Sequence, residues 1–364
     1  MERYFWAALQ TVPGLGNARL KNLVAFFGSA EQVWKAHRRD LFLCGCLDHG
    51  TCNNLLTQRE KIDIHKCAED WTQKGIHVLS LADGEYPSLL AKTCDPPTVL
   101  YYKGRLPALQ PLIAIVGARR SSAYGQNAAG MLAAELADAG VGIVSGAARG
   151  IDTAAHKGTL KQDGYTIAVL GCGVDICYPP ENAILLADIA EKGLVLSEYA
   201  PGTAPLPKFF PIRNRIISGL ALGVVVVEAA EKSGSLITAD FALEEGREVF
   251  AVPGSIFSAA SKGTHRLLKQ GAKPVETAAD ILEEFRFTQP VKPVRTLPLL
   301  SGDQAAVLLT LSFDTPIGMD EIIVKSRLSP QVVVPMLVQL EIQGFVAQYS
   351  GQRFVRIPGR ESVE

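Results

Sequence analysis

Short apolar runs rich in β-branched residues recur along the middle of the chain, and stretches with helical spacing separate them. Most of these runs are followed by Gly, Ser or Glu. They cover residues 113–116, 141–144, 166–170, 194–196, 224–227 and 248–252. Strands buried on both faces have this appearance. Because helical stretches connect them, the pattern predicts an α/β domain with a doubly wound parallel sheet.

The first 75 residues have a different pattern. Apolar positions at helical spacing lie on either side of a Pro-Gly-Leu-Gly turn at residues 13–16. This pattern predicts a domain of short helices. The turn also resembles a helix–hairpin–helix, whose backbone amides contact DNA phosphates, although a protein-interaction domain of the same fold is the favoured interpretation.

The C-terminal part of the chain contains three helical patterns and a hairpin. The helices are expected at residues 304–311, 319–325 and 330–343, and the hairpin strands at 344–349 and 353–357. This is the outline of a winged helix–turn–helix. Prolines at 290, 293 and 298 indicate a linker before it. The expected organisation is a helical domain, a sheet domain, a Pro-rich linker and a winged-helix domain, at residues 1–75, 76–285, 286–300 and 301–364.

Composition excludes several classes of protein. The 364 residues are 48% hydrophobic and 20% charged, with a net charge of −1, which fits two or three globular domains. The longest apolar run, at residues 216–227, is shorter than the roughly 20 residues of a membrane span. Residues 1–6 lack a secretory h-region, and the seven cysteines are odd in number and scattered. We therefore expect a cytoplasmic protein without a membrane partner.

Glycine-containing loops follow five of the predicted strands, at residues 117–122, 145–152, 171–173, 198–203 and 228–236. Glycine allows backbone N–H groups to approach an oxyanion, and these loops meet at one edge of a parallel sheet. The alternative is that they form only tight turns. None has the fingerprint of dinucleotide binding or of a P-loop.

A cationic segment with two aromatic residues stands out in the sheet domain. Residues 199–219 contain three cations and no carboxylate, whereas residues 111–285 as a whole contain 15 Lys and Arg against 19 Asp and Glu. Cations interleaved with rings are typical of single-stranded nucleic-acid binding. Two alternatives remain open: Phe209 and Phe210 pack in the core, or Arg213 and Arg215 pair with carboxylates.

Six ordered motifs in the sheet domain resemble the DprA/Smf family of bacterial DNA-processing proteins. They begin at Ile115, Ser145, Ser197, Phe210, Ser233 and Phe250, in the sequences IVGAR, SGAARGID, SEYAPGT, FPIRNRIISG, SGSLIT and FAVPG. The resemblance spans about half of the chain. It implies an extended Rossmann-like sheet domain, an N-terminal SAM-like helical domain and a C-terminal winged helix.

The resemblance also implies a function. Members of this family bind single-stranded DNA, form homodimers and load the RecA recombinase on incoming DNA during natural transformation, and they are not known as enzymes. No cofactor is implied. The DNA-binding residues carried over from the family, with the neighbouring loop residues, are Gly117, Arg119, Ser122, Gly146, Arg149, Lys208, Phe209, Phe210, Arg213 and Asn214.

Three other features are candidates for a metal site, a catalytic site or a DNA-binding helix. The spacing of Cys44, Cys46, His49 and Cys52 is not a standard zinc pattern, so no metal is expected. Asp152 and His156 lie four residues apart, which suits acid–base catalysis, a helix cap or a buried hydrogen bond. The helix at residues 330–343 has no Lys or Arg, which favours protein contact over DNA binding in the C-terminal domain.

The sequence therefore predicts a non-enzymatic, single-stranded DNA-binding recombination mediator. The alternative is a nucleotide-processing enzyme of the ribose-phosphate-cleaving Rossmann type. Such enzymes use a Pro-Gly-Gly-x-Gly-Thr loop, which residues 201–203 and 233–235 match only in part. A transcription factor acting through the winged helix is disfavoured, because residues 301–364 contain five basic and seven acidic side chains.

Overall fold

The computed structural model describes residues 1–107, 110–287 and 300–357. Its centre is a nine-stranded sheet with the order β1-β2-β6-β5-β4-β3-β7-β8-β9. The strands are β1 (His77–Ser80), β2 (Val99–Gly104), β3 (Leu112–Val116), β4 (Gly142–Ser145), β5 (Thr166–Leu170), β6 (Leu194–Ser197), β7 (Gly223–Val226), β8 (Glu248–Ala251) and β9 (Lys273–Pro274). The seven strands from β3 to β9 are parallel, which confirms the predicted doubly wound sheet.

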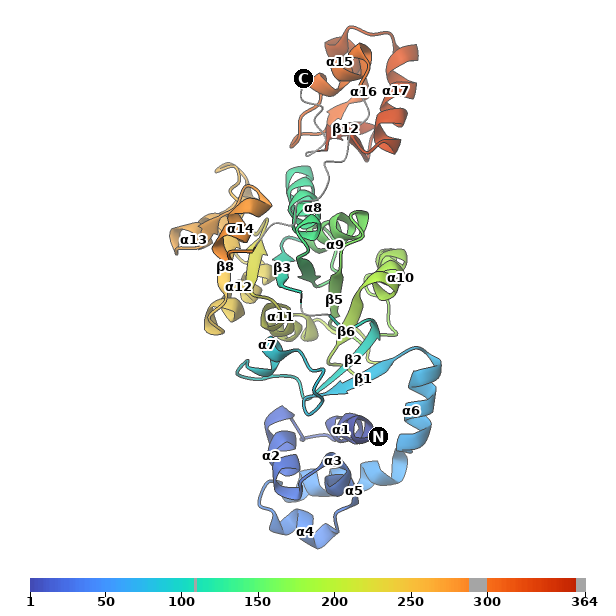
Figure 1. Ribbon diagram of the computed structural model, residues 1–364, viewed down its shortest axis with the longest axis vertical. Coiled ribbons are helices and arrows are strands. Elements are labelled where there is room, and N and C mark those ends of the chain that lie inside the picture. The colour runs from blue at the N-terminus through green and yellow to red at the C-terminus, as the bar shows by residue number, and fades with distance from the viewer. Residues whose placement is uncertain (108–109, 288–299, 358–364) are drawn as a thin grey trace.

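Helices cover both faces of the sheet (Figure 1). One face carries α8 (Ala123–Asp138), α9 (Ile151–Lys161), α10 (Ala183–Lys192) and α14 (Ala278–Glu284), and the other carries α11 (Phe209–Leu220), α12 (Gly234–Glu244) and α13 (Lys262–Lys269). Successive side chains of β3 point to opposite faces, so both layers of helices are needed to bury them. Ile115 lies in the core under α8 and α9, and Ala114 lies in the core under α11 and α12. Two 3-10 turns, η1 (Pro180–Asn182) and η2 (Ala259–Ser261), precede α10 and α13.

The crossovers reverse direction between β3 and β7. The chain passes from β3 through α8 to β4 on one side, whereas β7 lies on the other side of β3 and leads through α12 to β8. In doubly wound sheets, ligands bind beyond the carboxyl ends of strands at such a switch point. The loops after β3 and β7 therefore form the place to look for a site.

The N-terminal helices pack against an antiparallel extension of the sheet (Figure 1). They are α1 (Glu2–Gln10), α2 (Asn17–Phe27), α3 (Ala30–Lys35), α4 (Arg38–Leu43), α5 (His49–Lys61) and α6 (Ile64–Gln73), and the short α7 (Ser88–Ala91) lies between β1 and β2. β1 pairs with β2, and β2 pairs with β6, both in antiparallel register. The ring of Trp71 in α6 lies 5.5 Å from that of Tyr101 in β2, so the helical part shares a core with the sheet edge.

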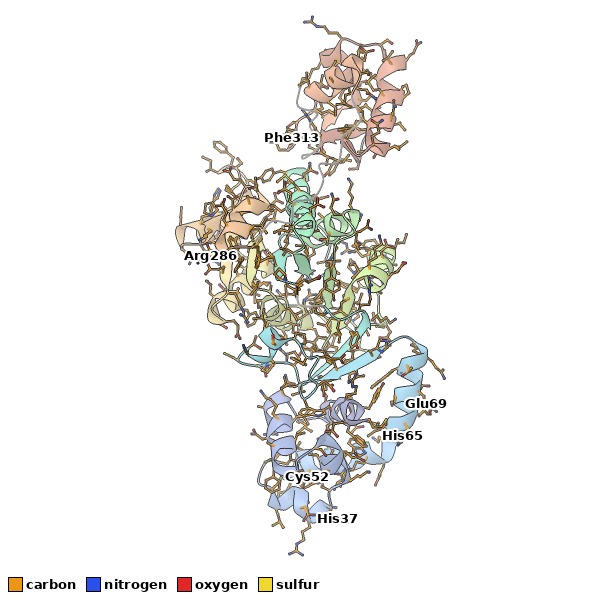
Figure 2. The ribbon with its side chains drawn as sticks, viewed as in Figure 1. His37, Cys52, His65, Glu69, Arg286 and Phe313 are labelled. Atoms are coloured by element: carbon orange, nitrogen blue, oxygen red, sulfur yellow. The ribbon has the colours of Figure 1, made fainter. Side chains whose placement is uncertain are left out.

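The C-terminal part has the winged-helix outline expected from the sequence. It contains α15 (Gly302–Thr310), α16 (Met319–Ser326) and α17 (Pro330–Ile342), with a sheet of β10 (Ile317–Gly318), β12 (Arg353–Arg356) and β11 (Val346–Tyr349). Phe313 lies on the side that faces the sheet domain (Figure 2), where Asn127 Nδ2 of α8 donates to its carbonyl at 2.9 Å. Most of the expected linker, and residues 358–364, lie outside the described residues.

Within the described residues, none of the helices is both long enough and apolar enough to span a membrane.

Candidate nucleic-acid interface

A cavity of about 620 Å³ opens at the switch point, beyond the carboxyl ends of β3 and β7. Residues 116–120, at the end of β3 and just after it, form one wall, and residues 230 and 232–235, just before α12 and in its first turn, form another. The first turns of α11 contribute Phe210, Pro211 and Asn214. We call this the switch-point cavity. Its position follows from the topology, because the loops after β3 and β7 separate toward opposite faces of the sheet.

A cation lies over an aromatic ring at the mouth of the cavity. The guanidinium carbon of Arg119 is 5.1 Å from the centre of the Phe210 ring, within the range of a cation–π contact. The Tyr178 ring lies 5.4 Å from the same ring. Arg119 is exposed and has no ion-pair partner among the described residues. These three side chains offer a positive charge and flat apolar surfaces side by side.

The adjacent aromatic residue points elsewhere. The Phe209 ring stacks on Tyr199 at 4.2 Å, and Lys208 Nζ lies 5.3 Å from its centre. Phe210 lines the switch-point cavity, whereas Phe209 is not among its lining residues. The structure therefore distinguishes two rings that the sequence left equivalent. Exposed Lys208 lies at the turn that leads into α11.

Arg213 is a buried structural link rather than a free charge. Its guanidinium donates to the carbonyl of Gly146 at 2.9 Å and to that of Val169. Burial lowers the pKa of Arg213 to about 10, and neighbouring Asp152 partly offsets this effect. A Cβ on Gly146 would lie 2.6 Å from Arg213 Nη2, which explains the glycine. Arg213 thus joins the loop after β4 to α11, and it also lines the switch-point cavity, while its expected contact with DNA stays a prediction.

Three other expected site residues build the frame of the cavity. Ser122 accepts from the Gly125 amide at the start of α8, and its hydroxyl donates to Glu228. Gly117 lines the cavity where a Cβ would lie 2.9 Å from the Glu228 carbonyl oxygen. Asn214 Nδ2 donates to the Gly234 carbonyl at 3.1 Å and so joins α11 to α12.

Arg149 is exposed but carries a compensated charge. Its guanidinium forms an ion pair with Glu181, with Nη2 3.0 Å from Oε2. It borders a smaller hollow that Arg119 and Phe210 also line. Of the expected cations, Arg119 and Lys208 therefore present charge without an ion-pair partner in the described parts of the chain.

The other features weighed from the sequence are structural here. Arg215 pairs with Glu198, as one alternative proposed. His156 is fully buried, with Nδ1 2.7 Å from Thr166 Oγ1, and burial lowers its pKa to about 3. Asp152 accepts from the Ala148 amide at 3.2 Å. Across the described residues, no group of three or more His, Cys, Asp or Glu side chains is placed to hold a metal ion.

Sequence reasoning missed three side chains that line the cavity, namely Arg120, Tyr178 and Lys232. Arg120 and Lys232 belong to glycine-containing loops already given, at residues 117–122 and 228–236, but neither was singled out as a site residue. Arg120 follows Arg119, and Lys232 directly precedes the Ser-Gly-Ser loop, so adjacency to these loops was the available signal. Tyr178 lies five residues beyond Gly173, and only the fold places it beside Phe210.

Two family models match the chain. Residues 77–286 match the family described as DNA recombination-mediator protein A, and residues 291–352 match the DprA winged helix domain. The chain belongs to this DprA/Smf family. The resemblance expected from the motifs is thereby confirmed.

Relatives of the chain include proteins that match nearly its whole length. Protein Smf of Synechocystis is 33% identical over 98% of this chain and 99% of its own length. The DNA processing protein DprA of Streptococcus pneumoniae is 49% identical over 57% of this chain and 74% of its own length. Protein Smf of Escherichia coli is 42% identical over 80% of this chain and 80% of its own length.

Solved DprA structures share the fold. The X-ray structure of Streptococcus pneumoniae DprA aligns with a TM-score of 0.70 at 39% identity, covering 79% of this chain and 99% of that one. A Helicobacter pylori DprA structure, described as giving insights into a unique single-stranded DNA binding mode, aligns at 0.53 with 32% identity. It covers 58% of this chain and 95% of that one.

Proposed function

We propose that this DprA family member binds single-stranded DNA, without sequence preference, at the switch-point cavity. The observation that carries the proposal is the Arg119 guanidinium held 5.1 Å above the Phe210 ring, at the edge of a cavity built from glycine loops. A base stacks on an aromatic face regardless of its identity, and a cation beside it attracts the phosphate. The Helicobacter pylori neighbour, described by its single-stranded DNA binding mode, supports the same function.

The cavity's charge fits a modest, salt-sensitive interaction. Arg119, Arg120 and Lys232 line the cavity, and Lys208 lies near it, before α11; all four are exposed and have no ion-pair partners within the described ranges. Neutralising three or four phosphates on a single strand gives a salt slope of about −2 to −3, from roughly −0.7 per phosphate. One protomer therefore binds weakly, and duplex DNA, whose bases are already stacked, binds more weakly still.

The proposal is tested by fluorescence anisotropy with a labelled oligothymidine and its duplex, over a range of salt concentrations. Arg119→Ala and Lys208→Glu are expected to lower single-strand affinity and to reduce the salt slope. Arg266→Ala, an exposed arginine on α13, is the matched control and leaves binding unchanged. Equal affinity of wild type and both site variants contradicts the proposal.

We further propose that the chain mediates recombination by loading RecA on incoming DNA, in the cytoplasm, during natural transformation. The family's description as a recombination mediator supports this role. The direct test is RecA filament formation on DNA coated with single-strand binding protein, with and without this chain. An absence of stimulation contradicts RecA loading and leaves single-strand binding as a separate question.

The same proposal includes a homodimer, since two cavities on one strand raise avidity. The turn before α13 exposes two apolar side chains, Ile256 at 77% and Phe257 at 93%, and this is the surface that we assign to the dimer. Exposed apolar side chains next to each other favour protein contact.

We propose that the chain acts by binding rather than by catalysis. The lowered pKa of buried His156 keeps its imidazole neutral near pH 7, and its Nδ1 is engaged by Thr166. Asp152 is held by the Ala148 amide. Release of free base from nucleoside monophosphates, followed by chromatography, tests the alternative of a ribose-phosphate-cleaving enzyme, and we expect none above background.

A further inference from the structure

A buried carboxylate lies behind the loop that carries Arg119. Glu228 follows β7, is only 3% exposed and forms no ion pair within the described residues. Its Oε2 accepts from the Ser122 amide at 2.9 Å, and its Oε1 accepts from the Ser122 hydroxyl at 2.5 Å. Because burying a carboxylate is unfavourable unless its oxygens are hydrogen-bonded, these bonds fix the carboxylate and Ser122 against each other.

Glu228 also holds the other end of this loop. The Ala118 amide donates to the Glu228 carbonyl at 2.8 Å. A Cβ on Gly117 would lie 2.9 Å from that carbonyl oxygen, and a Cβ on Gly125 would lie 2.4 Å from the Glu228 carboxylate. Glycine at both positions therefore allows the close approach. Glu228 thus binds the loop on both sides of Arg119.

Arg119 depends on this support because its own contact is weak. Its side chain is exposed, and its guanidinium lies over the Phe210 ring. A cation–π contact at an exposed site is too weak to order a long side chain together with the backbone that carries it. The position of the guanidinium over the ring therefore depends on how the backbone of residues 117–122 is held.

We propose that Glu228 is a positioning residue of the DNA-binding site, whose carboxylate holds residues 117–122 so that Arg119 stays over Phe210 and faces the strand. This role rests on the proposed function of the switch-point cavity. Glu228 acts through the loop and does not contact DNA itself, since it is not among the described residues that line the cavity.

The charge of Glu228 acts in the opposite direction from its hydrogen bonds. A carboxylate near the cavity repels phosphates, so its removal would by itself raise the affinity for single-stranded DNA. The carboxylate lies at the amino-terminal end of α8, where a helix favours an anion, and it occupies the Ser122 amide. The Gly125 amide is taken by the Ser122 hydroxyl. Positive charge at this wall therefore comes from the side chains that the carboxylate positions.

Two neutral substitutions separate these effects in anisotropy measurements with oligothymidine and the full chain. Glu228→Met fills a similar space without an acceptor, and Glu228→Gln keeps one acceptor oxygen. Repulsion alone predicts that both variants bind more tightly than wild type, to the same extent. Positioning predicts that Glu228→Met loses affinity and that its salt slope falls by up to about 0.7, the share of one phosphate. Glu228→Gln is then expected to recover part of both.

Glu135→Met is the matched control for charge and for packing on α8. Glu135 Oε2 accepts from the Ala278 amide at 3.0 Å, and Glu135 does not line the switch-point cavity. Its substitution therefore removes a carboxylate that joins two elements but leaves the loop at Arg119 in place. Single-strand affinity of Glu135→Met is expected to equal that of wild type, and a loss equal to that of Glu228→Met overturns the proposal.

Arg119→Ala in the same assay shows whether Glu228 acts through Arg119. The double variant Arg119→Ala/Glu228→Met is expected to bind no more weakly than Arg119→Ala, because no guanidinium is left to position. A further loss in the double variant overturns the proposal. Glu228→Met that binds as well as wild type, while Arg119→Ala binds weakly, also overturns it and leaves the proposed function standing. No loss for Arg119→Ala contradicts the proposed function itself.

Trypsin gives a readout that does not depend on DNA. Cleavage after Arg119 and Arg120 requires a loosened loop, so we expect mass spectrometry to detect it in Glu228→Met and not in wild type or Glu135→Met. Global unfolding would expose sites throughout the chain. A loop that resists trypsin in Glu228→Met overturns the proposal. If that variant is cut throughout, cleavage of Glu228→Gln at the loop alone supports the proposal, and its resistance there overturns it.

Discussion

At the scale of single residues, recognition in the proposed site depends on which ring a base can reach. Phe210 has Arg119 on it and lines the cavity, while Phe209 is covered by Tyr199 on one side and approached by Lys208. A stacked base contributes about 1–3 kcal/mol, as alanine substitution shows in other single-strand binders. Only a ring that a base can reach supplies this energy, and of these two rings it is Phe210 that lines the cavity.

The matched pair Phe210→Leu and Phe209→Leu tests this difference. Leucine keeps an apolar side chain and removes the ring, so we expect Phe210→Leu to weaken single-strand binding by about 1 kcal/mol or more, roughly fivefold. Phe209→Leu is expected to change it by less than twofold. Anisotropy at fixed salt measures both affinities. A larger loss of affinity for Phe209→Leu than for Phe210→Leu would show that Phe209 is the stacking ring and would contradict this assignment.

Burial of His156 predicts a pH dependence of stability. Its folded pKa of about 3 lies below the unfolded value of 6.5, so the unfolded chain binds a proton that the folded chain does not. This term lowers the free energy of unfolding as the pH falls from 6.5 toward 3, by up to about 1.4 kcal/mol per pH unit. Urea unfolding at pH 7.5, 6 and 5 should show that the free energy of unfolding falls less steeply with pH in His156→Gln than in wild type.

His265→Asn is the control for this measurement. His265 is half-buried, with Nε2 3.0 Å from the Gly254 carbonyl oxygen. Its substitution should leave the pH slope as in wild type. Identical slopes for wild type and His156→Gln would show that another group governs acid unfolding.

At the scale of elements, the close packing of α8 on α9 depends on glycine. A Cβ on Gly158 would lie 2.3 Å from the Gly130 carbonyl oxygen, and backbone cannot move aside cheaply. Gly158→Ala is therefore expected to destabilise the protein by about 1–3 kcal/mol, as overpacking does. Gly302→Ala, at the open start of α15, should be neutral or stabilising. Thermal unfolding compares the two variants, and equal midpoints would contradict the close packing of α8 on α9 at Gly158.

The elements with local signals could be predicted from the sequence, and those fixed by distant contacts could not. Six of the seven parallel strands match their apolar runs to within one residue, because strands buried on both faces need continuous hydrophobes, whereas the two-residue β9 had no predicted run. The antiparallel pair of β1 and β2 was not predicted. Its strands are four and six residues long, lie far apart in the sequence, and pair where Leu79 and Tyr101 are buried by other elements.

The candidate site shows the same division. Arg119 and Lys208 were expected to bind DNA, and the structure leaves both side chains exposed. The sequence could not show that Arg213 donates to two carbonyls, since Gly146 and Val169 lie 67 and 44 residues away along the chain. The choice between the two phenylalanines depends on Tyr178 and Tyr199, which come from two other loops.

At the scale of the whole molecule, weak single sites require a dimer to hold a strand. If the exposed turn at Ile256 and Phe257 joins two protomers, the second cavity binds the same strand as an intramolecular event, which raises affinity without any new contact. The gain appears only on a strand long enough to reach both cavities. Length dependence therefore separates a defect in the dimer from a defect in the site.

Phe257→Asp is expected to place like charges in the dimer contact and to yield a monomer in sedimentation experiments. On oligothymidine of about five nucleotides, which occupies one cavity, its affinity should equal that of wild type. On oligothymidine of about thirty nucleotides, it should bind at least tenfold more weakly, since avidity gains commonly exceed this factor. Arg119→Ala is expected to lose affinity on both lengths. A Phe257→Asp variant that stays dimeric contradicts this dimer surface, and a monomer that keeps full affinity for the long strand contradicts the avidity argument.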